Sequence, residues 1–245
     1  MIIANDMALI TFLPLGYFAL SVTKQEKYMA YLFVLQNISA NLGGMLTPFG
    51  NPQNLYLYSF FNIPTGEFCK IMLPAFLLAI FLLAVACLPI KPICFTIDEE
   101  FGEKLDIKKT VVYLVLFALS ILIVFRIIPF VAGLVIIPAI LFFVDRDSLL
   151  MVDYALLGTF FFFFIFAGNL ARLDVVNNLI SSLLEKDTLL VSVLSCQFIS
   201  NVPSAILLSQ FTENYADLLV GVNIGGAGTL IASLASLITF REYTK

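Results

Sequence analysis

Two short stretches of the chain share a pattern that could bind a small ion or an anionic substrate. Residues 41–47 read NLGGMLT and residues 223–229 read NIGGAGT, so both follow N-x-G-G-x-x-T at an offset of 182 residues. Paired glycines can break a membrane helix, which frees backbone carbonyl and amide groups as ligands. The candidate binding residues are Asn41, Gly43, Gly44 and Thr47 in the first stretch and Asn223, Gly225, Gly226 and Thr229 in the second.

A second pair of motifs places an asparagine inside an apolar run. Residues 4–8 read ANDMA and residues 200–204 read SNVPS. In both halves this asparagine comes a few dozen residues before the Gly-Gly motif, so the two halves repeat the same order. Each motif alone is weak, because glycines and amides also serve helix packing in membranes. Together they predict one site that adds Asn5, Asp6, Ser200 and Asn201.

The elements that must position these residues are membrane helices. The chain of 245 residues is 61% hydrophobic and 12% charged, whereas a soluble domain is about a quarter charged. Charge-free runs such as 71–90, 154–171 and 218–240 reach the length of roughly 17–25 residues that crosses a bilayer as a helix. Short polar breaks, including residues 172–187, separate them. The sequence therefore predicts an all-α polytopic membrane protein.

Several classes of function are excluded by composition. The chain has no histidine, which removes His-dependent zinc sites, Ser-His catalysis and imidazole relays. Its four cysteines lack metal-binding spacing, and no paired aspartates or Ser-Lys pair lie within the apolar runs. We therefore expect no enzyme, no metal centre and no cofactor. The net charge of −4 lies in short loops, so the expected partner is the lipid bilayer, and no nucleic acid.

The charged segment 91–109 divides the chain into an incomplete first repeat at 1–90 and a second repeat at 110–245. If residues 188–212 turn back at Asn201, nine of the 13 lysines and arginines share one side with this linker. The positive-inside rule makes that side cytoplasmic. The two motif sets then enter from opposite sides, which predicts inverted repeats, each with a re-entrant hairpin and an unwound transmembrane helix.

The same comparison of the halves predicts a chain truncated at both ends. Three spans and half a hairpin precede Asn201 in the second half, but only four residues precede Asn5. The first half adds a span at 68–90 after its Gly-Gly motif, and the second half has no matching span. We expect the first repeat to lack its beginning and the second repeat its last helix.

At these motifs the chain resembles the ion transporter superfamily, which includes citrate transporter-like permeases, arsenite permeases, divalent anion:sodium symporters and a sodium/proton antiporter branch. The resemblance rests on ANDMALITFLPL, NLGGMLTPFGNPQNL, VDYALLGTFFFFFIFAGNL, SNVPSAILLS and LLVGVNIGGAGTLIASLASLI. It implies two inverted repeats that move in an elevator-like manner. Dicarboxylate symporters carry Ser-Asn-Thr at the hairpin tips, but here Ala4-Asn5-Asp6 and Ser200-Asn201-Val202 look closer to the arsenite-permease and citrate-like branch.

The resulting hypothesis is a secondary transporter of a small anion, such as citrate, another carboxylate or arsenite, in the plasma (inner) membrane. The coupling ion is Na⁺ or H⁺, with Na⁺ expected at Asn5, Asn41, Asn201 and Asn223. Alternatives are a sodium/proton antiporter on the same fold and a non-transporting truncated membrane protein. Asp6 is an intramembrane carboxylate that could carry a proton, bind a cation or cap a helix. A homodimer is the assembly state to test.

Overall fold

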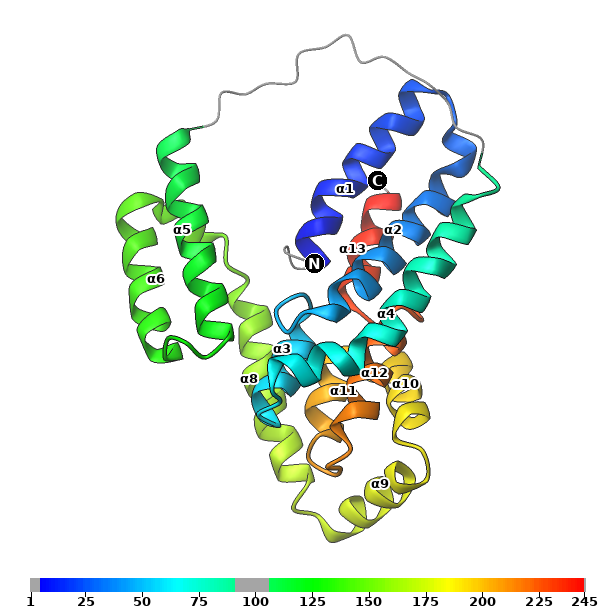
Figure 1. Cartoon of the computed structure of the whole chain (residues 1–245), viewed down its shortest axis with the longest axis vertical. Coiled ribbons are helices and arrows are strands. Elements are labelled where there is room, and N and C mark those ends of the chain that lie inside the picture. Colours follow the sequence, from blue (N-terminus) through cyan, green and yellow to red (C-terminus); the bar gives the residue numbers. More distant parts are fainter. Residues whose placement is uncertain (1–4, 91–105, 245) are drawn as a thin grey trace. The chain divides into compact units, whose positions relative to one another are not determined.

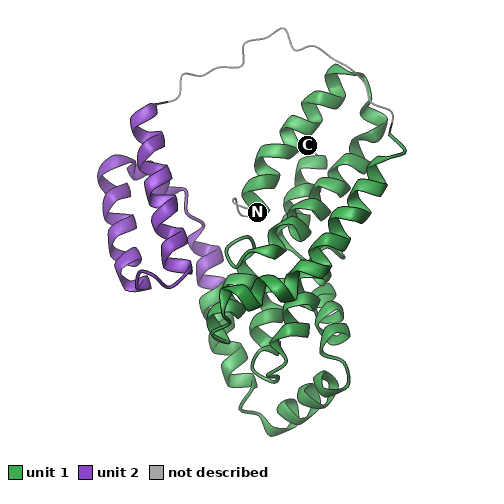
Figure 2. Cartoon of the chain, in the orientation of Figure 1, with its two compact units in different colours: residues 1–93, 160–245 green, residues 94–159 purple. Residues whose placement is uncertain are grey.

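The computed structural model describes residues 5–90 and 106–244, and within these ranges every regular element is a helix (Figure 1). The chain divides into two compact units, residues 1–93 with 160–245 and residues 94–159 (Figure 2). Both Gly-Gly motifs and both asparagine motifs belong to the first unit. The predicted all-α class is confirmed for the described residues.

Among the described residues, three helices are long and apolar enough to cross a membrane: α1 (Asn5–Val22), α4 (Thr65–Cys87) and α5 (Ile107–Val124). Helices α8 (Tyr154–Leu170) and α9 (Asp174–Lys186) together meet the same criterion, but they are bent by 97° at a short break. The large apolar side chains of α4, such as Leu78 and Phe81, are exposed as a lipid-facing surface requires. The chain is thus a polytopic helical membrane protein.

The first half of the larger unit contains a broken helix. After α1 and the 3₁₀ turn η1 (Glu26–Tyr28), α2 (Met29–Gly43) leads through η2 (Gly44–Leu46) and an irregular stretch to α3 (Pro52–Phe60). Thr47 is extended before Pro48, as the ring of a following proline favours. Pro52 occupies the first turn of α3, where its missing N–H costs nothing.

The second half contains a tight helical hairpin followed by another broken helix. Helix α10 (Thr188–Ile199) and α11 (Asn201–Leu208) are joined at Ser200, whose φ of 74° lies in the left-handed region. The hydroxyls of Ser195 and Ser204 lie 2.9 Å apart across the hairpin. Helix α12 (Tyr215–Gly226) is then separated from α13 (Leu234–Tyr243) by residues 227–233. The predicted turn at Asn201 is therefore present, and its re-entry into the bilayer stays a prediction.

The structure repeats itself at the offset of 182 residues read from the sequence. The rings of Phe33 and Tyr243 lie 6.1 Å apart, and those of Phe61 and Tyr215 lie 5.5 Å apart. Shifting Phe33 by 182 positions gives Tyr215, and shifting Phe61 gives Tyr243, so one contact is the image of the other. The halves are interlocked, because α1 and α2 both pack on α13 while α11 and α12 both pack on α3.

Both helix breaks begin later than the sequence predicts. Asn41 and Gly43 lie in the last turn of α2, and Asn223, Gly225 and Gly226 lie in the last turn of α12. The irregular segments start only at the residues that follow. A glycine near the end of a helix is compatible with helical geometry, so the Gly-Gly pair marks the end of each half-helix and does not itself unwind.

The smaller unit consists of α5, α6 (Phe130–Val144) and α7 (Arg146–Leu150). Asp106 caps α5 by accepting from the amides of Lys108 and Lys109. The hydroxyl of Tyr113 and the ammonium of Lys109 hold the pKa of the Asp145 carboxyl below its usual value. Residues 91–105 of the predicted cytoplasmic linker lie outside the described ranges, and its assignment to the cytoplasm stays a prediction.

Alanine substitutions at the adjacent Gly43 and Gly44 should have opposite effects. A Cβ atom on Gly44 would collide with Asn51 Oδ1 and would lie 2.9 Å from the carbonyl oxygen of Gly50, whereas one on Gly43 would meet nothing within 4 Å. We expect Gly44→Ala to lower the free energy of unfolding by about 1–3 kcal/mol. Gly43→Ala should leave it unchanged or raise it by up to about 1 kcal/mol. Unfolding in detergent would measure both, and equal stability of the two variants would contradict the close approach.

Candidate functional site

Asn223, in the last turn of α12, lies at the centre of a network of side-chain hydrogen bonds. It is fully buried. Its Nδ2 donates to the carbonyl of Leu219 at 2.8 Å and to Asn54 Oδ1 at 2.6 Å. Its Oδ1 accepts from Asn51 Nδ2 at 2.9 Å and from Gln53 Nε2 at 3.1 Å. Because a carboxamide has two donors and two acceptor lone pairs, its hydrogen-bonding capacity is used completely.

The same α3 residues satisfy the backbone freed at the first break. Asn54 Nδ2 lies within hydrogen-bonding distance of the carbonyls of Gly44, Met45 and Thr47, at 3.4, 3.1 and 3.3 Å. Asn51 Nδ2 also donates to the carbonyl of Asn41 at 2.9 Å. Carbonyls at a helix end need such partners where no water reaches them. The break is therefore held by side chains of the helix that follows it.

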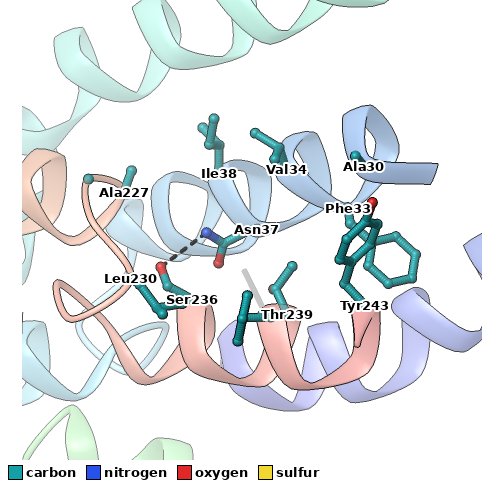
Figure 3. A pocket seen from close by; sticks show the side chains of 12 residues that line it. Ala30, Phe33, Val34, Asn37, Ile38, Ala227, Leu230, Ser236, Thr239 and Tyr243 are labelled. Atoms are coloured by element: carbon teal, nitrogen blue, oxygen red, sulfur yellow. Dashed lines mark hydrogen bonds between the residues drawn. The ribbon is translucent and has the colours of Figure 1, made fainter. Parts of the chain in front are cut away.

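Asn41 occupies the position in α2 that Asn223 occupies in α12. Its Nδ2 donates to the carbonyl of Asn37 at 3.0 Å, as Asn223 donates to Leu219. Asn37 Nδ2 in turn donates to the hydroxyl of Ser236 in α13 at 3.1 Å (Figure 3). Each half-helix that precedes a break is thus hydrogen-bonded to the half-helix that follows the break of the other repeat.

Asn5 and Asn201 make the same contacts in both repeats. The backbone amide of Asn5 donates to the carbonyl of Gly50 at 3.2 Å, and that of Asn201 donates to the carbonyl of Ala232 at 2.8 Å. Gly50 and Ala232 are again 182 positions apart. Each side-chain oxygen accepts from the next amide, that of Asp6 at 2.9 Å and that of Val202 at 2.8 Å. Each asparagine thus joins the start of its helix to the neighbouring break.

Gln197 in α10 supports the second break and escaped the sequence analysis. Its Nε2 donates to the carbonyl of Gly225 at 2.9 Å, and its Oε1 accepts from the backbone amide of Thr229 at 2.8 Å. Thr229 Oγ1 donates to the carbonyl of Gln197 at 3.3 Å. The available signal was a lone amide side chain one helical turn before Asn201, within an apolar run.

Three buried amide oxygens in this network have no hydrogen-bond partner: Asn41 Oδ1, Asn51 Oδ1 and Gln53 Oε1. Each of these residues is about 1% exposed. Their NH₂ groups already donate to backbone carbonyls or to Asn223 Oδ1, which points each oxygen in the opposite direction within its amide plane. A buried acceptor without a donor costs about 1–3 kcal/mol. A cation or a ligand donor at these oxygens would remove that cost.

The predicted site residues divide by their contacts. The contacts above include Asn5, Asn41, Asn201, Asn223, Gly225 and Thr229, and Thr47 enters through its carbonyl. Ser200 Oγ donates to the carbonyl of Ala232 at 3.3 Å. Gly44 and Gly226 are needed for close approach, since a Cβ on Gly226 would lie 2.7 Å from Asn201 Nδ2. Asp6 begins α1 half-buried, with Oδ1 unpartnered. Gly43 touches none of these groups. Asn51, Gln53 and Asn54 were not among the predicted site residues.

Helix ends meet at these contacts and set the electrostatics of the site. Helices α1, α3, α11 and α13 begin here, while α2, α10 and α12 end here. Helix N-termini carry partial positive charge and C-termini partial negative charge. Such an arrangement can bind an anion at the first set of ends and a cation at the carbonyl and amide oxygens of the second set.

Replacing Asn223 by leucine should destabilise the fold far more than the same change at Asn169. Both amides donate to a carbonyl four residues earlier, but Asn169 is exposed, and its side chain makes no other hydrogen bond within the part of the chain that the structure describes. Asn223→Leu leaves Gln53 Nε2 and Asn54 Oδ1 without a partner and removes one of the two hydrogen bonds of Asn51 Nδ2, so we expect a loss of about 3 kcal/mol or more. Asn169→Leu should change stability by less than about 0.5 kcal/mol. Denaturant unfolding in micelles would compare them, and equal losses would refute the role of Asn223.

Comparison with known proteins agrees with this architecture. The sequence profile of the citrate transporter family (CitMHS) matches residues 1–235. An uncharacterized transporter of Methanocaldococcus jannaschii is 37% identical over 246 residues, which is 98% of this chain and 66% of the relative. The inner membrane protein YbiR of Escherichia coli is 32% identical over 252 residues, 98% of this chain and 65% of the relative. The chain thus spans about two thirds of the length of these relatives, and no solved structure matches it. It belongs to the citrate transporter family.

Proposed function

We propose that the chain is the core of a secondary active transporter that moves a small anion across the plasma (inner) membrane in exchange for, or together with, Na⁺ or H⁺. The observation that carries the proposal is the set of unpartnered amide oxygens of Asn41, Asn51 and Gln53, which lie where the helix ends of the two repeats meet. Family membership and the relatives' names support a transporter and not an enzyme. The proposed substrates are citrate or another carboxylate, or arsenite.

Binding of the anion is assigned to the hairpin tips. Asn5 and Asn201 stand at the N-termini of α1 and α11, where helix ends stabilise negative charge. Both side-chain oxygens accept from the amide that follows, so the NH₂ group of each asparagine faces away from its own helix start. Two such groups, one from each repeat, could donate to the oxygens of a small oxyanion.

Binding of the coupling cation is assigned to the neutral oxygens of the first break. Carbonyl and amide oxygens suit a monovalent hard cation such as Na⁺, whereas divalent cations favour several carboxylates. In the described ranges no cluster of His, Cys, Asp or Glu side chains could hold a metal ion. A Na⁺ at Asn41 and Asn51 would neutralise part of the charge that the anion brings, which gives a physical reason for coupled binding.

The hydrogen bonds between the hairpin tips and the helix breaks are suited to break and re-form during transport. The backbone amide at each tip donates one hydrogen bond to its break, Asn5 to Gly50 and Asn201 to Ala232. In the second repeat, side-chain contacts of Ser200 and Gln197 add to it. A single hydrogen bond contributes about 1 kcal/mol net, so substrate binding can replace it. The buried amide network around Asn223 has no such weak point, and it would keep the repeats together while the tips open.

Uptake into liposomes would test the proposal directly. The purified chain is reconstituted and offered citrate, dicarboxylates and arsenite, with an imposed Na⁺ gradient in one arm and a pH gradient in the other. We expect gradient-driven uptake of at least one anion and a loss of at least tenfold in Asn5→Ala and in Asn201→Ala, because both remove a donor at the anion.

The matched control is Asn169→Ala, which removes an amide on the exposed side of α8 and should transport normally. Uptake that survives both hairpin substitutions would refute the shared anion site. Absence of uptake for every anion under both gradients would refute anion transport and leave sodium/proton antiport or a non-transporting membrane protein as the remaining assignments.

Sodium/proton antiport is the second candidate, and the unpartnered Oδ1 of half-buried Asp6 favours it. In that case Asp6 carries the proton, and Asp6→Asn should abolish Na⁺-driven proton movement while anion uptake remains. A pH-sensitive dye inside the liposomes would report the exchange. Loss of anion uptake without loss of proton exchange would contradict the antiport assignment.

A further inference from the structure

Helix α9 presents an apolar stripe and a polar stripe side by side. Residues four positions apart lie on one face of an α-helix, and Val175, Leu179 and Leu183 form the apolar stripe. They are 81%, 60% and 42% exposed. The polar stripe is also exposed and lies about a quarter of the way around the helix; it consists of Asp174, Asn178 and Ser182. The free surface of α9 is therefore amphipathic along its whole length.

A third stripe of α9 joins the helix to the rest of the larger unit. Leu184 is 2% exposed, and Ile180, one turn earlier, is half-buried. Ser181 Oγ donates to the carbonyl of Phe211, which lies just beyond α11, at 3.3 Å. The helix also packs on α10. These contacts fix the rotation of α9 about its own axis, and they leave the apolar stripe outside the packed core.

The direction of α9 follows from the helix that precedes it. Helix α8 is an apolar helix of 17 residues, a length at the lower end of the range that crosses a bilayer. The axis of α9 is bent from that of α8 by 97° (Figure 1). A helix nearly perpendicular to a membrane-crossing helix runs parallel to the membrane surface. Arg172 and Lys186 stand near its two ends, where long basic side chains can reach the lipid headgroups.

We infer that the stripe of Val175, Leu179 and Leu183 is a lipid-binding surface, with α9 lying in one leaflet at the boundary between headgroups and acyl chains. The partner is the phospholipid of that leaflet. Its acyl chains cover the apolar stripe, while headgroups and water cover the polar stripe. Asp187 follows the end of α9 and caps the start of α10 through the amide of Leu190. The same anchor therefore sets the depth at which the hairpin of α10 and α11 begins.

Tryptophan reporters measure the depth of each position, because the chain contains no tryptophan. Val175→Trp, Leu179→Trp and Leu183→Trp report on the apolar stripe, and Ser182→Trp is the matched exposed reporter on the polar stripe. Each variant is reconstituted in phosphatidylcholine vesicles whose acyl chains carry bromine near the headgroup or near the methyl end. We expect bromine near the headgroup to quench the stripe reporters about threefold more than Ser182→Trp, because such a face is buried only about 5–10 Å deep. Aqueous iodide should quench them in the reverse order.

The three stripe reporters also distinguish a helix in the membrane plane from one that crosses the bilayer. Val175 and Leu183 are about 12 Å apart along the axis of α9. An in-plane helix gives the same ratio of shallow to deep bromine quenching at all three positions. A ratio that changes steadily from Val175→Trp to Leu183→Trp would overturn the inference. Shielding of the stripe reporters from both bromine and iodide would assign the stripe to a protein neighbour, such as a second copy of the chain, and would also overturn it.

Discussion

The four hydrogen bonds of the Asn223 carboxamide are the interaction on which the two repeats depend. A helix that stops inside an apolar environment leaves carbonyl groups that no water can reach. Asn223 binds three side chains of α3, two of which, Asn51 and Asn54, satisfy the end of α2. The first break is therefore stable only while the second repeat is docked against it. Neither broken helix could be buried alone without unpaired polar groups.

The network is not symmetric, and the asymmetry has a simple cause. Asn41 is the repeat counterpart of Asn223, but its side-chain oxygen has no partner. The positions that correspond to Asn51 and Gln53 are Ser233 and Ala235, whose side chains are one to three groups shorter. Ser233 instead caps α13 and contacts Ser236. The second repeat thus lacks the amide groups that could donate to Asn41 Oδ1. This oxygen is therefore available to a ligand, whereas the oxygen of Asn223 is not.

The sequence was sufficient for the helical class, the repeat and the turn at Asn201, which the structure places one residue earlier, at Ser200, because each of these depends on residues that are neighbours along the chain or share a pattern. It placed both breaks a few residues early, since glycine pairs are compatible with a last helical turn. It treated residues 172–187 as a polar break, although most of them form α9. The contributions of Gln53 and Gln197 could not be seen, because an amide inside an apolar run becomes informative only when its partners, distant in the chain, are known.

The chemistry of the site follows from amides and helix ends, not from fixed charges. Among the site residues named above, only Asp6 is ionisable. It follows Asn5, and the residue that follows Asn201 in the second repeat is the uncharged Val202. Neutral donors and acceptors in a low-dielectric region bind an ion strongly only when the opposite charge enters with it, because a single unpaired ion would lose its hydration without compensation. A cation at the oxygens of Asn41 and Asn51 and an anion at the hairpin tips would compensate each other. Binding of the two would then be cooperative, which is the thermodynamic requirement for coupled transport.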